Sequence, residues 1–466
     1  MIRILLYPNI SLPKKNNTLQ DRSYIEFLSL FINQMNIKRS DIFWYIILPS
    51  SDSRDFSELE KLRKSLYFSN TYFINLNIPD YPLNRIHFDV NELKQKLKLD
   101  QYPIDLIFSH QPEISRKLKL FFNIHTNLNP PIIGYLHLFE LPKINWEGIF
   151  EYTIFGITEM ESCFINTAYQ KQLVFEEARK IFKSSICGQL HEKLEMFPDT
   201  IIPKNIKTNK SGTYEKIIVW NHTVDEKKNF LDFEKTILTL RKKRNDFKVW
   251  FPMMKDTHRL SKEYRWIINN NFKSKKEYFK ILRKCCVGVS PKKTYGEWLD
   301  ATIEGNLCGI PYIVYDESYY KEYNNAGDYF KTRKQLLLLL NTYLDNSNYR
   351  NEMASKAISN YIIKYNTMKK VEIVSRKINS IQNKKKTIRS KLTNKIISII
   401  KNESEISHKE LLGKKFLDWD PNIKFDRYRK SILKTKGIIE NDYLSKSKKH
   451  RNKRFNWKSI YRYEKT

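Results

Sequence analysis

Short runs of consecutive apolar residues recur along the first half of the chain, and each run predicts a buried strand. These runs cover residues 2–7, 43–48, 72–77, 105–109, 132–137 and 151–157. Between them, apolar positions three and four residues apart predict helices over 19–35, 90–97 and 168–182. Because the strands do not alternate apolar and polar residues, we expect a parallel sheet with both faces covered.

The pattern restarts after residues 197–208, a stretch with two prolines that we interpret as a linker. Strands are predicted over 216–221, 247–251, 287–290 and 312–315. Helices are predicted over 229–243, 275–283, 332–343 and 351–364, with another beginning near residue 297. The two alternations predict an α/β chain of two Rossmann-like domains facing a cleft, over 1–200 and 209–375.

The remaining residues, 376–466, differ in composition and form a predicted basic extension, mainly helical or disordered, with a helix candidate over 375–401. The chain has a net charge of +32, and this extension holds 27 Lys and Arg against 9 Asp and Glu. An AT-rich genome alone would raise the number of Lys residues, but it would not lower the number of acidic residues at the same time. Basic clusters interleaved with aromatic residues predict a nucleic-acid partner. A membrane surface, or a solvated tail without a partner, stays as an alternative.

Composition also excludes several classes of site. The chain has only 12 glycines and contains neither Gly-rich phosphate-binding motif. Its five cysteines are odd in number and lack metal-ligand spacing, which indicates a reducing cytoplasm. The first residues turn polar too soon for a signal peptide, and no apolar run reaches 18 residues. We expect no metal, no tightly bound cofactor, and a cytoplasmic or peripheral-membrane location.

The segment 286–314 carries the strongest chemical signal. It reads as a buried strand, a polar loop containing Thr294, Tyr295 and Gly296, a helix, and a second strand. Amide groups at such a helix N-terminus bind a diphosphate. Glu297 and Glu304 are seven residues apart, about 10.5 Å along one helix face. These features predict a nucleotide-sugar site, although first-turn acids also stabilise helices without any ligand.

A second segment, Trp220-Asn-His-Thr-Val-Asp-Glu-Lys-Lys-Asn229, follows the first strand of the second domain. His222 and Lys228 are candidates to hold the donor diphosphate, whose negative charge grows as the sugar leaves. The alternative is a solvated loop, because lysines at a strand end are usually exposed.

The string Glu304-Gly-Asn-Leu-Cys-Gly-Ile-Pro311 resembles the retaining GT-B glycosyltransferases of family 4. That family spaces its two acids eight residues apart, whereas Gly296 occupies the earlier position here, so Glu297 and Asp300 compete for its role. The segment beginning at Trp220 resembles the tRNA-queuosine mannosyltransferase group, which has an Arg where this chain has Thr223.

A third resemblance concerns the acceptor side. The string IIGYLHLFELP, which contains His137, is similar to a Tyr-x-His segment of the queuosine mannosyltransferases and of phage DNA α-glucosyltransferases. It implies a role for His137 in orienting the sugar or the acceptor, although a lone strand-end His is more often structural. His110 and Asn166 follow neighbouring strands and are further acceptor-side candidates.

Together the resemblances imply a retaining, metal-independent glycosyltransferase, with His137 and Glu297 as its catalytic residues. They imply a UDP-sugar donor and, as acceptor, a hydroxymethylated base in phage-type DNA in the host cytoplasm. Two alternatives stay open: a surface-polysaccharide or lipid-linked sugar transferase held at the membrane, and a non-catalytic nucleic-acid-binding protein on a degenerate scaffold. The sequence leaves the sugar, the acceptor and the oligomeric state undetermined.

Overall fold

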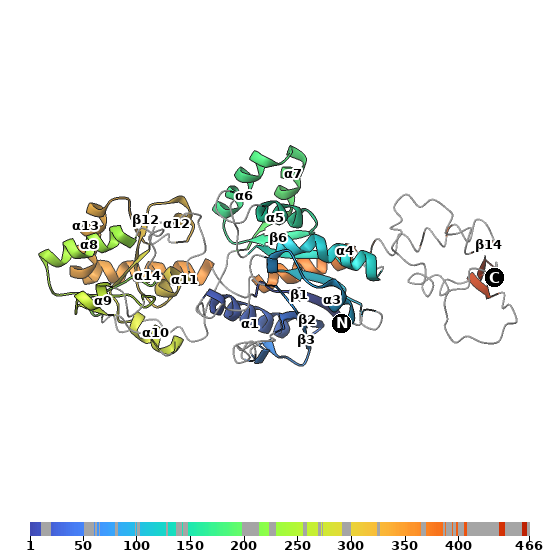
Figure 1. Cartoon of the computed structure of the whole chain (residues 1–466), viewed down its shortest axis with the longest axis horizontal. Coiled ribbons are helices and arrows are strands. Elements are labelled where there is room, and N and C mark those ends of the chain that lie inside the picture. The colour runs from blue at the N-terminus through green and yellow to red at the C-terminus, as the bar shows by residue number, and fades with distance from the viewer. Residues whose placement is uncertain are drawn as a thin grey trace.

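The structure is a computed structural model of the 466-residue chain. It describes residues 1–10, 20–50, 66–79, 83–97, 103–126, 129–136, 148–197, 214–222, 230–254, 259–268, 274–290, 300–323, 327–364 and 370–384. Elsewhere it describes single residues and three short strands near the C-terminus. Two α/β domains lie side by side along the long axis (Figure 1).

The N-terminal domain contains a seven-stranded sheet in the order β3-β2-β1-β4-β5-β6-β7, and its paired strands all run parallel. Its strands are β1 (Ile2–Tyr7), β2 (Ile42–Pro49), β3 (Thr71–Leu76), β4 (Leu106–Ser109), β5 (Ile132–Leu136), β6 (Ser162–Ile165) and β7 (Leu194–Met196). Its helices include α1 (Gln20–Lys38), α3 (Val90–Lys96), α4 (Ser115–Thr126), α5 (Ile149–Thr158), α6 (Ala168–Ile181) and α7 (Ser184–Lys193). Two short 3-10 helices are η1 (Leu83–Arg85) and η2 (Pro112–Ile114).

Both faces of this sheet are covered, as the continuous apolar strands predict. Ile4 and Leu6 of β1 pack in one core with residues of α1, whereas Leu5 and Tyr7 pack in another with residues of α3, α4 and α5. Adjacent residues of one strand therefore enter different cores.

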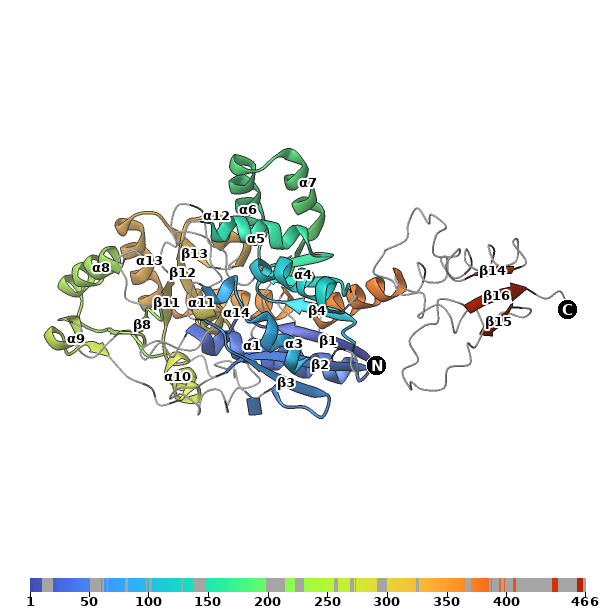
Figure 2. The same cartoon turned by 45° about the vertical axis from the view of Figure 1, so that its right-hand side comes forward.

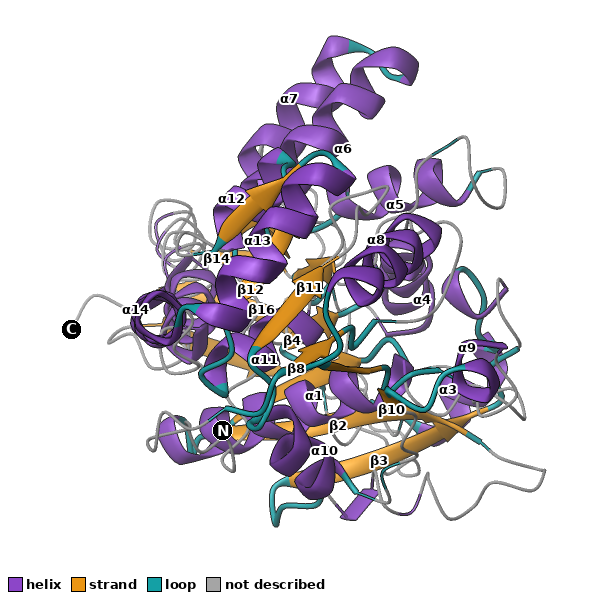
Figure 3. Ribbon diagram, turned by 90° about the vertical axis from the view of Figure 1, so that its left-hand side faces the viewer, coloured by secondary structure: helices purple, strands orange, loops and turns teal. Residues whose placement is uncertain are grey.

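The C-terminal domain repeats the arrangement with six parallel strands in the order β10-β9-β8-β11-β12-β13. The strands are β8 (Ile217–Val219), β9 (Lys248–Trp250), β10 (Ile267–Ile268), β11 (Val287–Ser290), β12 (Tyr312–Tyr315) and β13 (Asp328–Phe330). The helices are α8 (Phe230–Lys243), α9 (Arg259–Glu263), α10 (Lys275–Leu282), α11 (Asp300–Leu307), α12 (Ser318–Tyr323), α13 (Arg333–Asp345) and α14 (Ser347–Lys364). Figure 3 shows helices flanking the strands. Each sheet begins with the 3-2-1-4-5-6 strand order of dinucleotide-binding folds, which confirms two Rossmann-like domains.

The strand predicted over 151–157 is wrong, because these residues belong to helix α5. Ile149, Phe150, Thr153, Ile154 and Ile157 are buried, and this spacing is helical. A continuous apolar run bounded by Gly148 is ambiguous between a buried strand and a buried helix, and only the surrounding packing decides between them.

Helical residues 370–384 return from the C-terminal domain to the N-terminal one. Val371, Val374, Ile378 and Ile381 are buried in the core that contains α1. The boundary predicted at residue 375 therefore falls inside a helix that belongs to the N-terminal fold.

A small antiparallel sheet near the C-terminus was not predicted. Strands β14 (Glu405–Ser407), β15 (Ile438–Asp442) and β16 (Ser459–Tyr463) pair in the order β14-β16-β15. It lies beyond the N-terminal domain, on the side away from the C-terminal domain (Figures 1 and 2).

Candidate functional site

In each sheet the direction of strand succession reverses once, between β1 and β4 and between β8 and β11. Open α/β sheets bind their ligands beyond the carboxyl ends of the strands at such a switch point. His110 directly follows β4, and His222 lies three residues beyond β8. The structure therefore places these two candidate histidines at the two switch points.

The switch point of the C-terminal domain is bridged by hydrogen bonds. His222, which is 6% exposed, lies with its Nε2 3.2 Å from the Ser290 hydroxyl at the end of β11. The Ser290 hydroxyl also hydrogen-bonds the Thr302 hydroxyl in the first turns of α11. One chain of contacts thus connects β8, β11 and the predicted donor helix.

Asn221, beside His222, forms the densest set of contacts at this edge. Its amide nitrogen donates to the Tyr278 hydroxyl, 2.8 Å away, and to the Ala301 carbonyl, 2.9 Å away. Its amide oxygen accepts from the Tyr312 hydroxyl at 2.9 Å. Asn221 does not stand out in the sequence, because its partners are 57 to 91 residues away.

The Tyr312 ring is fully buried between two glycines. A Cβ atom at Gly288 of β11 would lie 2.3 Å from this ring, and one at Gly305 of α11 would lie 2.1 Å from it. Helix α11 therefore approaches the sheet more closely than a side chain at either position would allow. Its end is closed by Gly309, whose φ of 86° lets Ile310 N–H reach the Gly305 carbonyl at 2.9 Å.

Glu304 lies on α11 and is 8% exposed. Burial raises the pKa of Cys308 to about 12, and the nearby Glu304 carboxylate adds to that shift. Burial likewise raises the pKa of Tyr278, again with a contribution from Glu304. Glu304 is thus a charged group set at the edge of a largely apolar core.

The other donor-side and catalytic candidates lie outside the described residues, and their roles stay predictions. These are His137, Lys228, Thr294, Tyr295, Gly296 and Glu297.

The switch point of the N-terminal domain is formed by polar groups of β1, α1 and β4. Asn9 N–H donates to the Tyr24 hydroxyl at 2.9 Å, and that hydroxyl lies 2.6 Å from His110 Nδ1. This contact joins the polar group that follows β4 to helix α1. Gln111 Nε2 spans the same switch point, donating to Asn9 Oδ1 at 2.7 Å.

The two acceptor-side candidates are brought together through Tyr135 of β5. The rings of His110 and Tyr135 are 5.2 Å apart, and the Tyr135 hydroxyl donates to Asn166 Oδ1 at 2.7 Å. His110 and Asn166 are 2% and 1% exposed. Within the described part of the chain, Asn166 Nδ2 has no hydrogen-bond partner.

Glu113, close to His110 in sequence, forms a buried ion pair within the N-terminal domain. Its carboxylate pairs with Arg85 of η1 and accepts from Thr153 of α5 at 2.6 Å. Gly156 permits this packing, because a Cβ atom there would lie 1.8 Å from the Pro112 carbonyl oxygen.

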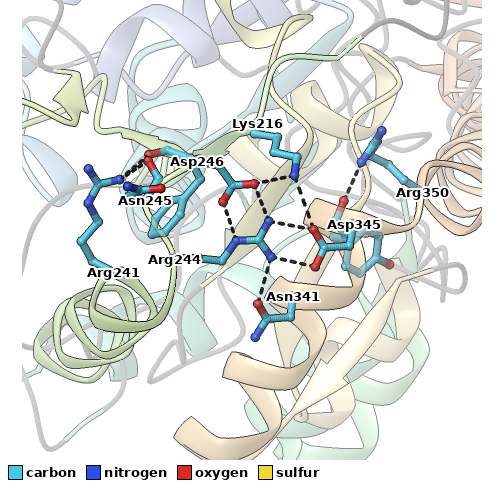
Figure 4. A network of polar contacts seen from close by, with 10 residues as sticks. Lys216, Arg241, Arg244, Asn245, Asp246, Asn341, Asp345 and Arg350 are labelled. Carbon is cyan, nitrogen blue, oxygen red and sulfur yellow. Dashed lines mark hydrogen bonds and ion pairs between the residues drawn. The ribbon is translucent and has the colours of Figure 1, made fainter.

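A separate charged network lies near the amino ends of the strands in the C-terminal sheet (Figure 4). Lys216 precedes β8 and Asp246 precedes β9, so both lie at the amino ends of their strands. The Arg244 guanidinium bridges Asp246 and Asp345 at 2.7–2.8 Å and, together with Lys216, holds the pKa of both carboxyls below their usual value. Because open α/β sheets bind ligands beyond the carboxyl ends of their strands, we interpret this network at the amino ends as structural.

Among the residues that the structure describes, no three His, Cys, Asp or Glu side chains gather as a metal site would require. Across the same residues, no helix is both long and apolar enough to cross a membrane.

Comparison with known proteins identifies similarity in structure only. No protein-family profile matches the chain, and no curated protein matches its sequence. HepE of Anabaena in complex with UDP-glucose is 12% identical, with a TM-score of 0.55 over 82% of this chain and 100% of HepE. TarM of S. aureus, in a complex containing UDP, is 12% identical, with a TM-score of 0.57 over 81% of this chain and 100% of TarM.

A glycosyltransferase from Rickettsia africae is also 12% identical, with a TM-score of 0.59 over 82% of this chain and 98% of that enzyme. At this level of identity the similarity concerns the fold. The chain thus has the two-domain GT-B architecture of these solved structures, over nearly their whole length.

Proposed function

We propose that this protein is a glycosyltransferase that transfers a sugar from a UDP-sugar to a hydroxyl acceptor. The observation that carries the proposal is the switch point of the C-terminal domain. There His222, Ser290 and Thr302 connect two strand ends to α11, which bears Glu304. The HepE and TarM structures, which are complexes with UDP-glucose and with UDP respectively, support this choice of donor.

In the proposed mechanism the diphosphate lies against the N-terminal end of α11. The positive end of the helix dipole, with His222 and Lys228, stabilises the charge that the leaving UDP gains. Glu304 accepts hydrogen bonds from ribose hydroxyls, and Glu297 contacts the sugar. Retention of configuration and independence from metal belong to this proposal.

The N-terminal domain supplies the acceptor side. His137, His110 and Asn166 orient the attacking hydroxyl there. We propose a hydroxymethylated base in DNA as the acceptor, because the extension holds 27 basic against 9 acidic residues and therefore attracts a phosphate backbone. A base taken out of its stack would expose the hydroxyl.

Glu304→Gln tests the donor site without a large change in volume. We expect UDP-glucose affinity to fall by at least about tenfold, since a hydrogen bond to a charged group contributes about 1.5–3 kcal/mol. Isothermal titration calorimetry measures it, with Glu352→Gln on α14 as the control because Glu352 is exposed and pairs with the exposed Lys356 one turn along the same helix. Equal affinity in the wild type and the Glu304 variant would contradict the assignment.

The acceptor is tested by incubating the full-length protein with radiolabelled UDP-glucose and one of three acceptors: hydroxymethylated DNA, unmodified DNA or a glycan. Label in the first alone supports the proposal, whereas label in the glycan alone overturns the DNA acceptor and favours a polysaccharide. A truncation that tests the extension must keep residues up to 384, because Ile378 and Ile381 belong to the N-terminal core. We expect the truncated protein to lose salt-sensitive DNA affinity.

A further inference from the structure

A direct contact between the two domains lies at the N-terminus of α6. The carboxylate of Glu322, on α12 of the C-terminal domain, accepts two backbone N–H groups of the N-terminal domain. Its oxygens lie 2.8 Å from Ala168 N and 2.5 Å from Tyr169 N. Figure 2 shows α12 beside α6.

Helix α6 already has a cap from its own domain. The Thr167 hydroxyl accepts Gln170 N–H at 2.9 Å, and the Thr167 carbonyl accepts Lys171 N–H at 3.0 Å. The N–H groups of Ala168 and Tyr169 are therefore the first-turn donors left to another partner. A carboxylate is the group that such a helix end favours, because the dipole is positive there.

The contact is anchored on both sides. Tyr320 of α12 is fully buried in the core of the C-terminal domain, and Lys321 pairs with Asp316 at 2.8 Å. On the other side, the Tyr169 ring packs against that same core from across the domain boundary. Glu322 thus projects from a fixed helix onto a helix that begins directly after Asn166 and Thr167.

The contact also fixes which edges of the sheets face each other. Helix α6 follows the carboxyl end of β6, and α12 follows the carboxyl end of β12. Their meeting brings the ligand-binding edges of the two sheets to the same side.

We propose that Glu322 is a positioning residue that holds the acceptor side of the N-terminal domain at a fixed distance from the donor side. It binds neither substrate and acts through α6 and the adjoining Asn166. The role in transfer rests on the proposed glycosyltransferase activity, whereas the effect on domain spacing does not.

Glu322→Ala removes both acceptor oxygens, and two measurements on the full-length protein test it. We expect the radius of gyration from small-angle X-ray scattering to increase. We expect kcat to fall about three- to tenfold. This is a small effect for hydrogen bonds to a charged group, because the contact is partly exposed to solvent. UDP-glucose affinity should stay within about twofold of the wild type, since the contact lies outside the donor residues.

Two control variants separate positioning from helix capping. Thr167→Ala removes the cap that α6 receives from its own domain, and Glu352→Ala removes an exposed acid from the C-terminal domain. A Glu322→Ala variant with wild-type radius and wild-type kcat would overturn the proposal. So would a Thr167→Ala variant that reproduced both changes, because capping alone would then explain them. A wild-type protein that fails to bind UDP-glucose, yet expands on Glu322→Ala, would refute the glycosyltransferase and keep the domain contact.

Discussion

Substitution of Asn221 by Ala should destabilise the C-terminal domain more than a typical point mutation does. The change removes hydrogen bonds to the Tyr278 hydroxyl, the Ala301 carbonyl and the Tyr312 hydroxyl. Each such bond contributes about 1 kcal/mol net, and a buried polar group that loses its partner costs more. We therefore expect a loss of about 3–5 kcal/mol, a large part of the roughly 5–15 kcal/mol that folded domains have.

A double-mutant cycle identifies how much of the loss comes from one bond. Tyr312→Phe removes a single hydroxyl and should cost about 1–2 kcal/mol in the wild-type background. In the Asn221→Ala background the bond is already absent, so the same change should cost about 1 kcal/mol less. UDP-glucose affinity should fall together with stability in Asn221→Ala, because the Ala301 carbonyl in the first turn of α11 loses its fixed donor.

Hydrogen exchange read by mass spectrometry is the suitable assay because the protein has two domains, so a single unfolding transition cannot be assumed. Peptides from β8, β11 and α11 should exchange faster in Asn221→Ala, whereas peptides from β1 and β4 should be unchanged. A stability loss under about 1 kcal/mol, or equal acceleration in both domains, would refute the reasoning.

Two further predictions concern packing and charge. Gly305→Ala should destabilise by about 2 kcal/mol or more, because its Cβ would overlap the Tyr312 ring. Gly188→Ala in α7 meets open space and should instead stabilise by about 0.5–1 kcal/mol in thermal melts. Asp246, whose pKa the Arg244 contact lowers from 3.8, stabilises above pH 3.8 and loses this effect as the pH falls below it. Asp246→Asn should therefore reduce the fall of the unfolding free energy with pH below 3.8, measured by urea titration. The change should be under about 1 kcal/mol, because the pair is exposed. An unchanged pH dependence would contradict the prediction.

The parallel strands could be predicted from the sequence, because a strand that is buried on both faces consists of consecutive apolar residues. The runs at 2–7 and 287–290 correspond to β1 and β11 at the same residues. The prediction failed where an apolar run formed a helix. In α5, the Thr153 hydroxyl donates to the Glu113 carboxylate, 40 residues away, and the same carboxylate forms an ion pair with Arg85, 28 residues away. The hydropathy of neighbouring residues does not predict such long-range contacts.

The candidate site was predictable in part for the same reason. His222, His110 and Asn166 lie just beyond strand ends, where the ligand groups of a parallel sheet gather, and Glu304 lies on the helix between β11 and β12. Asn221 was missed, because the sequence alone does not show whether an Asn side chain is buried or exposed. Its partners are hydroxyls that only the folded chain brings within 3 Å of it.

In the proposed function, the distribution of glycine explains how the C-terminal domain binds a diphosphate without a glycine-rich loop. Four of the 12 glycines lie within residues 288–309. Gly288 and Gly305 are used to bring α11 onto the sheet, and Gly309 ends the helix. Asn221 and Ser290 also hydrogen-bond residues in its first turn, so contacts within the protein itself hold α11 against the sheet. A helix dipole that needs no reorganisation stabilises the charge of a leaving diphosphate most effectively, so in the proposed function donor binding depends on this packing of α11.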